Sequence, residues 1–241
     1  MSFLSKNVRF TAADCSKPGL AARRGGLKSL SMLLVTAWLA APGFAQTPAP
    51  AKSQPSAPVI LVVGDSLSAE YGLKRGTGWV PLLEKQLASE KKNARVVNAS
   101  ISGDTTSGGR SRLPALLAQH KPDTVVIELG GNDALRGLPL DMTEKNLAAM
   151  TQAAKKAGAK VLLLGMQVPP NYGGAYGATF SGLFAKVAKT ENVALVPFFL
   201  KGIGDEADSA ANFQADRIHP NEASQARMLA NVWPELKKLV P

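Results

Sequence analysis

Cysteine is almost absent from this chain of 241 residues, because the only one is Cys15. It lies in the N-terminal stretch that we predict to be removed. The rest of the chain therefore excludes disulfide bonds, a thiol nucleophile and a cysteine-ligated metal site. A protein without thiols has nothing to misoxidise, which fits export to an oxidising compartment.

Long apolar runs and histidines are scarce as well. The apolar run from Leu30 to Ala41 is shorter than the roughly 20 residues that a membrane-spanning helix needs. The chain has two histidines. His120 precedes Lys121-Pro122 at a predicted helix end, and we interpret it as a surface residue. His219 is then the histidine available for chemistry.

The N-terminal region has the three-part pattern of a secretory signal peptide. A basic segment from Lys6 to Lys28 comes first, the apolar run follows, and small residues stand at Gly43 and Ala45. We predict cleavage after Ala45, so that residues 1–45 are a signal peptide; an uncleaved N-terminal anchor is the alternative. The sequence thus predicts a periplasmic or secreted protein with no stable membrane insertion after cleavage.

Positive charge is in excess, but half of it belongs to this leader. The chain carries +10, and the leader has six basic residues and one acid, which leaves +5 on the mature chain. The densest points of this remainder are the pairs Lys91-Lys92 and Lys237-Lys238. Solvated helix faces explain such a distribution better than nucleic-acid binding.

The remainder of the chain divides into a linker and a domain. Residues 46–57 are rich in Pro, Ala, Ser and Gln and predict a flexible linker before a domain at 58–241. In the domain, short β-branched runs alternate with segments of helical spacing. This alternation predicts an α/β protein, a three-layer α/β/α sandwich around a five-stranded parallel sheet. We expect strands at 59–63, 95–99, 124–129, 161–164 and 194–198, and helices at 79–90, 111–119, 143–157, 178–190 and 222–239.

Four small polar segments come after apolar strands of this predicted sheet. They are GDSLS at 64–68, SGDTT at 102–106, GGND at 130–133 and, beyond a longer loop, DRIHP at 216–220. Ligands of such sheets bind beyond the carboxyl ends of the strands. We therefore expect the four segments to converge on one site.

These segments contain each group that acyl transfer needs: a nucleophile, a base, a group that orients the base, and donors for the oxyanion. Ser66 is the candidate nucleophile and His219 the base, and Asp216 can hold the imidazole from three residues away. Gly103 offers a backbone N–H and Asn132 a carboxamide N–H. This chemistry uses no metal and no organic cofactor.

Each residue also has an ordinary structural interpretation. Ser66 can cap a helix, Gly103 can supply a turn of positive φ, and Asn132 can be a turn residue. The segment around His219 can be a surface loop. Four such coincidences at four strand ends favour a site.

In their order along the chain, the four segments resemble the motif blocks of the SGNH, or GDSL, hydrolase family, over roughly residues 58–240. The resemblance implies a flavodoxin-like SGNH hydrolase fold and a serine ester hydrolase without a cofactor. It also implies an oxyanion hole formed by the N–H of Ser66, the N–H of Gly103 and the side chain of Asn132. The G-x-S-x-G elbow of the other serine hydrolase fold is not matched, because Ser68 replaces its final glycine.

The sequence is most similar to the branch with multifunctional periplasmic thioesterases, arylesterases and lysophospholipases. In that branch, loops matched here by 134–139 and 170–173 flank the acyl groove. The resemblance implies a monomer that binds a small-molecule or lipid acyl ester. It implies substrate contacts from Asp65, Leu135, Leu138, Pro170 and Tyr172.

Two other functions stay open. A carbohydrate esterase that removes acetyl groups uses the same four segments, although Leu135, Leu138 and Leu140 favour a longer acyl chain. A catalytically inactive binding module on this fold is the alternative from another class, and the complete set of catalytic residues argues against it.

Overall fold

The computed structural model describes residues 57–206 and 208–240. The predicted signal peptide and nearly all of the predicted linker lie outside these residues. Within the described part of the chain, no helix is long and apolar enough to cross a membrane.

The centre of the domain is a sheet of five parallel strands in the order β2-β1-β3-β4-β5. Its residues are apolar and largely β-branched in β1 and β3, and both of these strands are fully buried. This is what a sheet covered on both faces requires. The strands are β1 (Val59–Gly64), β2 (Arg95–Asn98), β3 (Thr124–Glu128), β4 (Lys160–Leu164) and β5 (Ala194–Val196).

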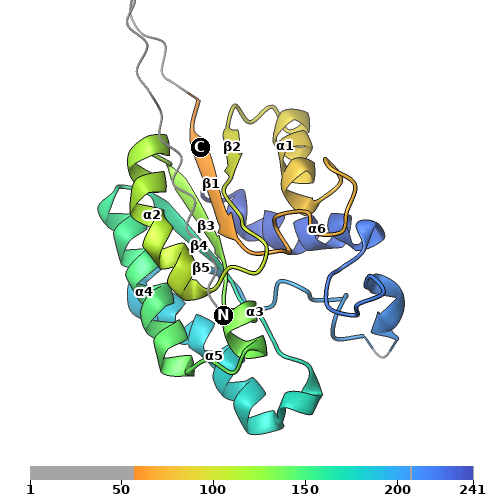
Figure 1. Cartoon of the computed structure of the whole chain (residues 1–241). Helices are drawn as coiled ribbons and strands as arrows, with labels where there is room; N and C mark the ends of the chain where they lie inside the picture. The colour runs from red at the N-terminus through yellow and green to blue at the C-terminus, as the bar shows by residue number, and fades with distance from the viewer. Residues whose placement is uncertain (1–56, 207, 241) are drawn as a thin grey trace, which may run out of the picture. The chain divides into compact units, whose positions relative to one another are not determined.

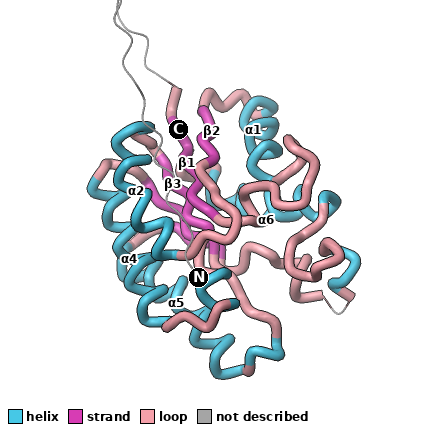
Figure 2. The backbone as a smooth tube through the Cα atoms, in the orientation of Figure 1, coloured by secondary structure: helices cyan, strands magenta, loops and turns pink. Residues whose placement is uncertain are grey.

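Helices cover both faces of the sheet and complete the predicted three-layer sandwich (Figures 1 and 2). On one face, α4 packs between α2 and α5; on the other, α1 packs against α6. The helices are α1 (Trp79–Ser89), α2 (Thr106–His120), α3 (Gly131–Leu135), α4 (Leu140–Lys156), α5 (Gly174–Glu191) and α6 (Gln225–Leu236), with 3-10 turns η1 (Pro170–Tyr172), η2 (Ser209–Asn212) and η3 (Glu222–Ser224).

The strands lie close to their predicted positions, but several helix starts do not. Helix α2 begins at Thr106, five residues before the prediction, because the Thr105 hydroxyl accepts a hydrogen bond from the N–H of Gly108 and caps it. Gly109 lies in this first turn, and its lack of a side chain is needed for packing, because a Cβ there would lie 2.2 Å from Leu129.

The GGND segment, whose Asn132 the sequence also allowed as a turn residue, is the start of the short helix α3. Gly130, at φ 122°, turns the chain from β3 into this helix. The buried Asp133 side chain then accepts hydrogen bonds from the Thr106 N–H at 2.9 Å and from the Thr143 hydroxyl at 3.2 Å. These bonds fix α3 to the starts of α2 and α4.

The strand order places a topological switch point between β1 and β3. The chain leaves β1 toward β2 on one side, and later runs from β3 toward β4 on the other. Open α/β sheets bind ligands at such a point. The segment with Ser66 follows β1 and the segment with Asn132 follows β3, so both lie there.

Candidate active site

Ser66 and His219 are 153 residues apart in the sequence and face each other in the structure. The Ser66 Oγ lies 2.9 Å from Nε2 of His219. The other ring nitrogen, Nδ1, lies 2.6 Å from Oδ2 of Asp216. This is the geometry of a nucleophile, a base and an orienting carboxylate.

A tight turn holds Asp216 and His219 together. One carboxylate oxygen of Asp216 accepts hydrogen bonds from the N–H groups of Ile218 at 2.9 Å and of His219 at 3.0 Å, which leaves the other oxygen for the ring. Desolvation raises the pKa of Asp216, but the hydrogen bonds from His219 and Ile218 outweigh it and lower the pKa to about 2. Asp216 is thus ionised at neutral pH, and its carboxylate can hold Nδ1 of the ring while Nε2 faces Ser66.

The backbone after β1 turns sharply at Ser66. The carbonyl of Asp65 accepts hydrogen bonds from the N–H groups of Ser68 at 3.3 Å and of Ala69 at 2.9 Å. The side chain that caps this turn is that of Asp65, which accepts from the N–H of Leu67 at 3.0 Å. The Ser66 hydroxyl is therefore free of a capping role and is bonded to His219.

Gly103 lies in the loop after β2, with a φ of 79° that favours glycine. The loop is held by the Ile101 N–H, which donates to the carbonyl of Gly64 at 3.0 Å. A Cβ on Gly103 would meet only a nitrogen of Arg136, at 3.5 Å. Its backbone conformation, more than a lack of space, requires glycine.

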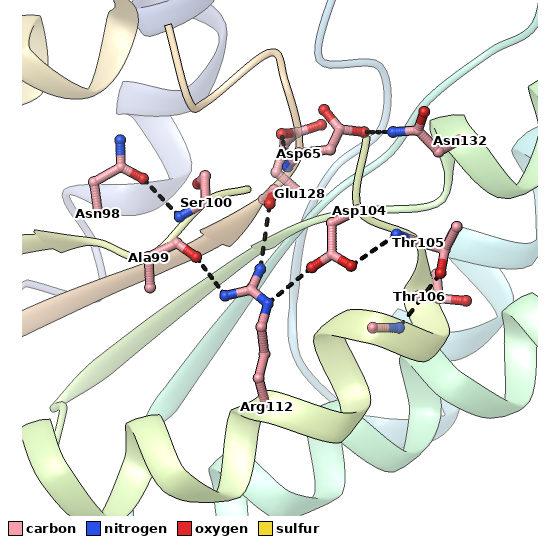
Figure 3. A network of polar contacts seen from close by, with 12 residues as sticks. Asp65, Asn98, Ala99, Ser100, Asp104, Thr105, Thr106, Arg112, Glu128 and Asn132 are labelled. Carbon is pink, nitrogen blue, oxygen red and sulfur yellow. Dashed lines mark hydrogen bonds and ion pairs between the residues drawn. The ribbon is translucent and has the colours of Figure 1, made fainter. Parts of the chain in front are cut away.

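Two arginines that the sequence did not single out hold this loop from both sides. Arg112 of α2 forms an ion pair of 2.8 Å with Asp104 and also donates to the carbonyl of Ala99 (Figure 3). Arg136, after α3, donates to the carbonyl of Gly103 at 2.8 Å. The Arg136 contact joins residues that are 33 positions apart in the sequence.

Asn132 lies in the first turn of α3, and its carboxamide Nδ2 donates to Oδ2 of Asp65 at 3.0 Å (Figure 3). Asp65 was expected among the substrate contacts. The structure places it behind Asn132, only 3% exposed, with its carboxylate directed at Asn132 and at the N–H of Leu67.

The three predicted oxyanion donors each have an N–H that is not used elsewhere in the described part of the chain. Within the described residues, no hydrogen bond uses the backbone N–H of Ser66 or of Gly103. Asn132 gives one N–H to Asp65 and retains a second. Unused donors beside a nucleophile can stabilise a developing oxyanion.

The model of the GDSL-like lipase/acylhydrolase family matches residues 62–227. The chain belongs to this family. It is a hydrolase that acts on ester bonds. The matched region contains all four segments that were predicted from the sequence.

Known members of the GDSL family are similar over most of this chain. Esterase TesA of Pseudomonas aeruginosa is 57% identical over 187 residues, which is 78% of this chain and 92% of that protein. Thioesterase 1/protease 1/lysophospholipase L1 of Escherichia coli K12 is 42% identical over 185 residues, 77% of this chain and 86% of that protein. The crystal structure of psychrotrophic esterase EstA from Pseudoalteromonas, inhibited by monoethylphosphonate, has a TM-score of 0.70 and 39% identity, and covers 75% of this chain and 97% of that one.

Tyr176 of α5 contacts both loops that were expected beside the acyl groove in this GDSL hydrolase. The Tyr176 hydroxyl, at the start of α5, donates to the carbonyl of Ala134 at 3.3 Å. The ring of Tyr172 stacks on Tyr176 with centroids 6.3 Å apart. Of the expected contacts, Leu135, Pro170 and Tyr172 are exposed and Leu138 is half-buried.

Tyr71 is a further site residue that the sequence analysis missed. Its ring lies against the imidazole of His219, and half of its side chain is exposed. Nothing in the local sequence marks it, because its partner is distant along the chain.

A hollow of about 510 Å³ lies next to the turn that carries Ser66. Its walls include Ala69 and Glu70 from that turn and Ser100 from the loop after β2. None of the triad residues lines it.

Proposed function

We propose that this enzyme cleaves carboxylic esters and thioesters through an acyl-enzyme on Ser66. His219 Nε2 takes the hydroxyl proton as Oγ attacks the carbonyl carbon. The tetrahedral oxyanion is held by the N–H groups of Ser66, Gly103 and Asn132. His219 then gives the proton to the departing alcohol or thiol. Water, deprotonated by His219, attacks the acyl-enzyme and releases the acid with Ser66 restored.

The observation that carries this proposal is the continuous chain from Ser66 Oγ through His219 to Asp216, at 2.9 Å and 2.6 Å. The unused N–H donors beside Ser66 support the oxyanion step. Together they provide each group that the two acyl-transfer steps use.

For substrates, we propose aryl esters, acyl-CoA-type thioesters and lysophospholipid-like acyl chains. The exposed apolar side chains of Leu135 and Tyr172, after β3 and β4, support an acyl chain longer than acetyl. The relatives described above do not favour the carbohydrate acetyl esterase. A panel of p-nitrophenyl and acyl-CoA esters tests this, with selectivity expected to rise from two toward eight carbons; selectivity for acetyl would restore the alternative.

We further propose that the protein is exported as a monomer to the periplasm or beyond, with residues 1–45 removed. The basic, apolar and small-residue pattern before Gln46 supports export. Mass spectrometry of the protein recovered from the periplasm of a bacterial host tests it. A mature N-terminus at Gln46 is the expected result, and recovery of the full-length chain in the membrane fraction would contradict it.

The direct test of the acyl-enzyme replaces the nucleophile. Ser66→Ala should lower kcat by a factor on the order of 10⁶, and an active-site fluorophosphonate should label the wild type once, at Ser66. The matched control is Ser89→Ala at the exposed end of α1, which should keep full activity and labelling. Activity that survives in Ser66→Ala would overturn the assignment.

A further inference from the structure

Two buried carboxyl groups lie side by side beneath the Ser66 turn, and the acyl-transfer steps use neither of them. Asp65 is 3% exposed and Glu128 is 2% exposed. They come together because Gly64 at the end of β1 is paired with Glu128 at the end of β3. The role of these two carboxyl groups that we argue for rests on the proposed acyl-transfer function.

The direction of the hydrogen bonds around Glu128 can be followed from Trp79. The indole Nε1 of Trp79 can only donate, and it donates to the Ser68 hydroxyl oxygen at 3.1 Å. The Ser68 proton is then directed to Glu128 Oε2, at 2.8 Å. This same oxygen also accepts from the N–H of Asp65 at 3.2 Å. Oε2 therefore accepts two hydrogen bonds. Because Oε2 is occupied as an acceptor, a proton carried by Glu128 is on the other oxygen, Oε1.

Asp65, in contrast, is surrounded by donors. It accepts from the N–H of Leu67 and from Nδ2 of Asn132, each at 3.0 Å. Glu128 is its neighbour, because Glu128 Oε2 accepts the N–H of Asp65 at 3.2 Å. Since the Asp65 carboxylate is the acceptor in its other contacts, a proton shared between the two carboxyl groups comes from Glu128.

The surrounding charges support the same assignment. Arg112 reaches the nearby carbonyl of Gly64 at 3.4 Å, but its charge is matched by Asp104. Two buried carboxylates without a bonded cation repel each other, so one retains its proton. Burial, and then the neighbouring Asp65, raise the pKa of Glu128 well above its usual range.

We propose that Glu128 is a positioning residue for the oxyanion hole, acting as a neutral acid that donates to the Asp65 anion. Asp65 in turn requires the Nδ2 side of the Asn132 carboxamide, because the amide oxygen in that place would face an anion. The second N–H of Asn132 is thereby presented to the reacting carbonyl. We call this chain of contacts from Glu128 through Asp65 to Asn132 the relay. The relay sets which end of the Asn132 amide faces the substrate.

The rest of the GDSLS segment fits this relay. A Cβ on Gly64 would lie 2.7 Å from Glu128 Oε2 and 2.8 Å from the Ser68 hydroxyl, so only glycine leaves room for their contact. At its far end, the network continues from Trp79, whose backbone N–H donates to Gln225 at 3.0 Å. Gln225 donates to the carbonyl of Pro220, which follows His219. One buried network thus links the oxyanion donor to the segment of the base.

The test compares Glu128→Gln with Glu128→Leu, using kcat and KM for a p-nitrophenyl ester. Glutamine is neutral, its amide can donate to Asp65, and its oxygen can accept from Ser68. Its kcat should stay within about threefold of wild type. Leucine removes the relay, and kcat should fall by about 10²-fold with KM little changed, since loss of an oxyanion donor costs about 10²–10³ in kcat. A loss in KM alone, or an equal loss in both variants, would overturn the proposal.

The matched control is Thr124→Val at the start of the same strand. Thr124 is buried and its hydroxyl has no hydrogen-bond partner among the described residues, so kcat should be unchanged. In Asn132→Ala the donor is already gone. Adding Glu128→Leu there should lower kcat by less than about threefold more, because both changes remove the same interaction. Full additivity would contradict the relay.

If thermal unfolding shows that Glu128→Leu does not fold, the pH profile of Glu128→Gln tests the proposal instead. Glu128→Gln removes no charge if Glu128 is neutral, so the acid limb of the kcat/KM profile should stay in place. If Glu128 is an anion, its loss moves that limb to lower pH and overturns the proposal. Fluorophosphonate labelling of the wild type distinguishes failure of the proposed function from failure of the relay. If Ser66 is not labelled, the acyl-enzyme itself is refuted. If Ser66 is labelled normally but the Glu128 variants do not behave as expected, only the relay is refuted.

Discussion

The phenol ring of Tyr71 lies against the imidazole of His219, with centroids 4.4 Å apart and planes inclined by 39°. A hydrogen bond also joins the two segments that carry these rings, because the Gln214 side chain donates to the carbonyl of Tyr71 at 2.9 Å. The segment after the nucleophile thus supports the base directly. The imidazole is held by Asp216 at one edge and by Tyr71 on its face.

Replacing Tyr71 should therefore affect the base and leave the fold intact. Aromatic pairs are worth about 0.5–1.5 kcal/mol beyond area burial, so Tyr71→Ala should lower kcat by about two- to tenfold. Tyr71→Phe keeps the ring and should keep kcat. Steady-state kinetics on a short aryl ester measure both. If phenylalanine is as slow as alanine, the hydroxyl and not the ring contact is responsible.

The Arg136 side chain gives a second prediction, because it tethers the carbonyl of Gly103 at 2.8 Å. Arg136→Ala should lower kcat by about tenfold, which is less than the roughly 10²–10³ that loss of an oxyanion donor costs. KM should change little. Lys145→Ala on α4, which removes an exposed cation paired with Asp141, is the control and should be silent. A rise in KM at constant kcat would instead indicate that Arg136 binds substrate.

Much of this site could be predicted from the sequence because its reacting groups stand in short, recognisable segments. Asp216 and His219 are three residues apart, and one turn suffices to join them. Ser66 and Asn132 each follow an apolar strand, and the parallel sheet brings such strand ends together. Chemistry of this kind is encoded locally, and the sheet topology supplies the rest.

The supporting residues could not be predicted in the same way. Glu128 ends an apolar strand, and its partner Asp65 is 63 residues away. Arg112 and Arg136 act on carbonyls of a loop that no local pattern connects to them. The helical state of the GGND segment depends on Asp133, whose partners Thr106 and Thr143 come from two other helices. These features arise from tertiary packing alone.

Asp216 is expected to act as an anion down to low pH. Its pKa, lowered to about 2, means that the carboxylate is charged and can orient His219 at every pH well above 2. Asp216→Asn keeps the shape but removes the charge, and kcat should fall by a factor on the order of 10³–10⁴. Titration of Asp216 should add no step to the acid limb of the wild-type profile above pH 3. Full activity of Asp216→Asn would remove this residue from the triad.

The stability of the folded protein should also depend on pH through Asp65. Because the pKa of Asp65 is raised on folding, this contribution falls as pH rises. Burial raises the pKa of Asp65 from 3.8 to about 6. The folded state therefore holds a proton that the unfolded chain releases, so this contribution is fully present below pH 3.8 and is lost as pH rises through about 6. The Asp65→Asn variant has no carboxyl group to titrate at this position, so it does not lose this stability as pH rises. Relative to wild type, its unfolding free energy should rise between pH 4 and pH 7, by at most about 3 kcal/mol at about 1.4 kcal/mol per pKa unit.

Urea unfolding of both proteins at a series of pH values measures this difference. Asp141→Asn is the control, because the pKa of the exposed Asp141 is lowered by its hydrogen bond and ion pair with Lys145. Its contribution is present above pH 3.8 and lost only at lower pH, so its difference from wild type should be flat between pH 5 and pH 7. A flat difference for Asp65→Asn as well would mean that Asp65 holds no extra proton in the folded state. Glu128→Gln then adds a final check. If Glu128 keeps its proton in the folded state, the wild type must release that proton on unfolding at pH 7, whereas glutamine has none to release. The unfolding free energy of Glu128→Gln relative to wild type should therefore be higher at pH 7 than at pH 4.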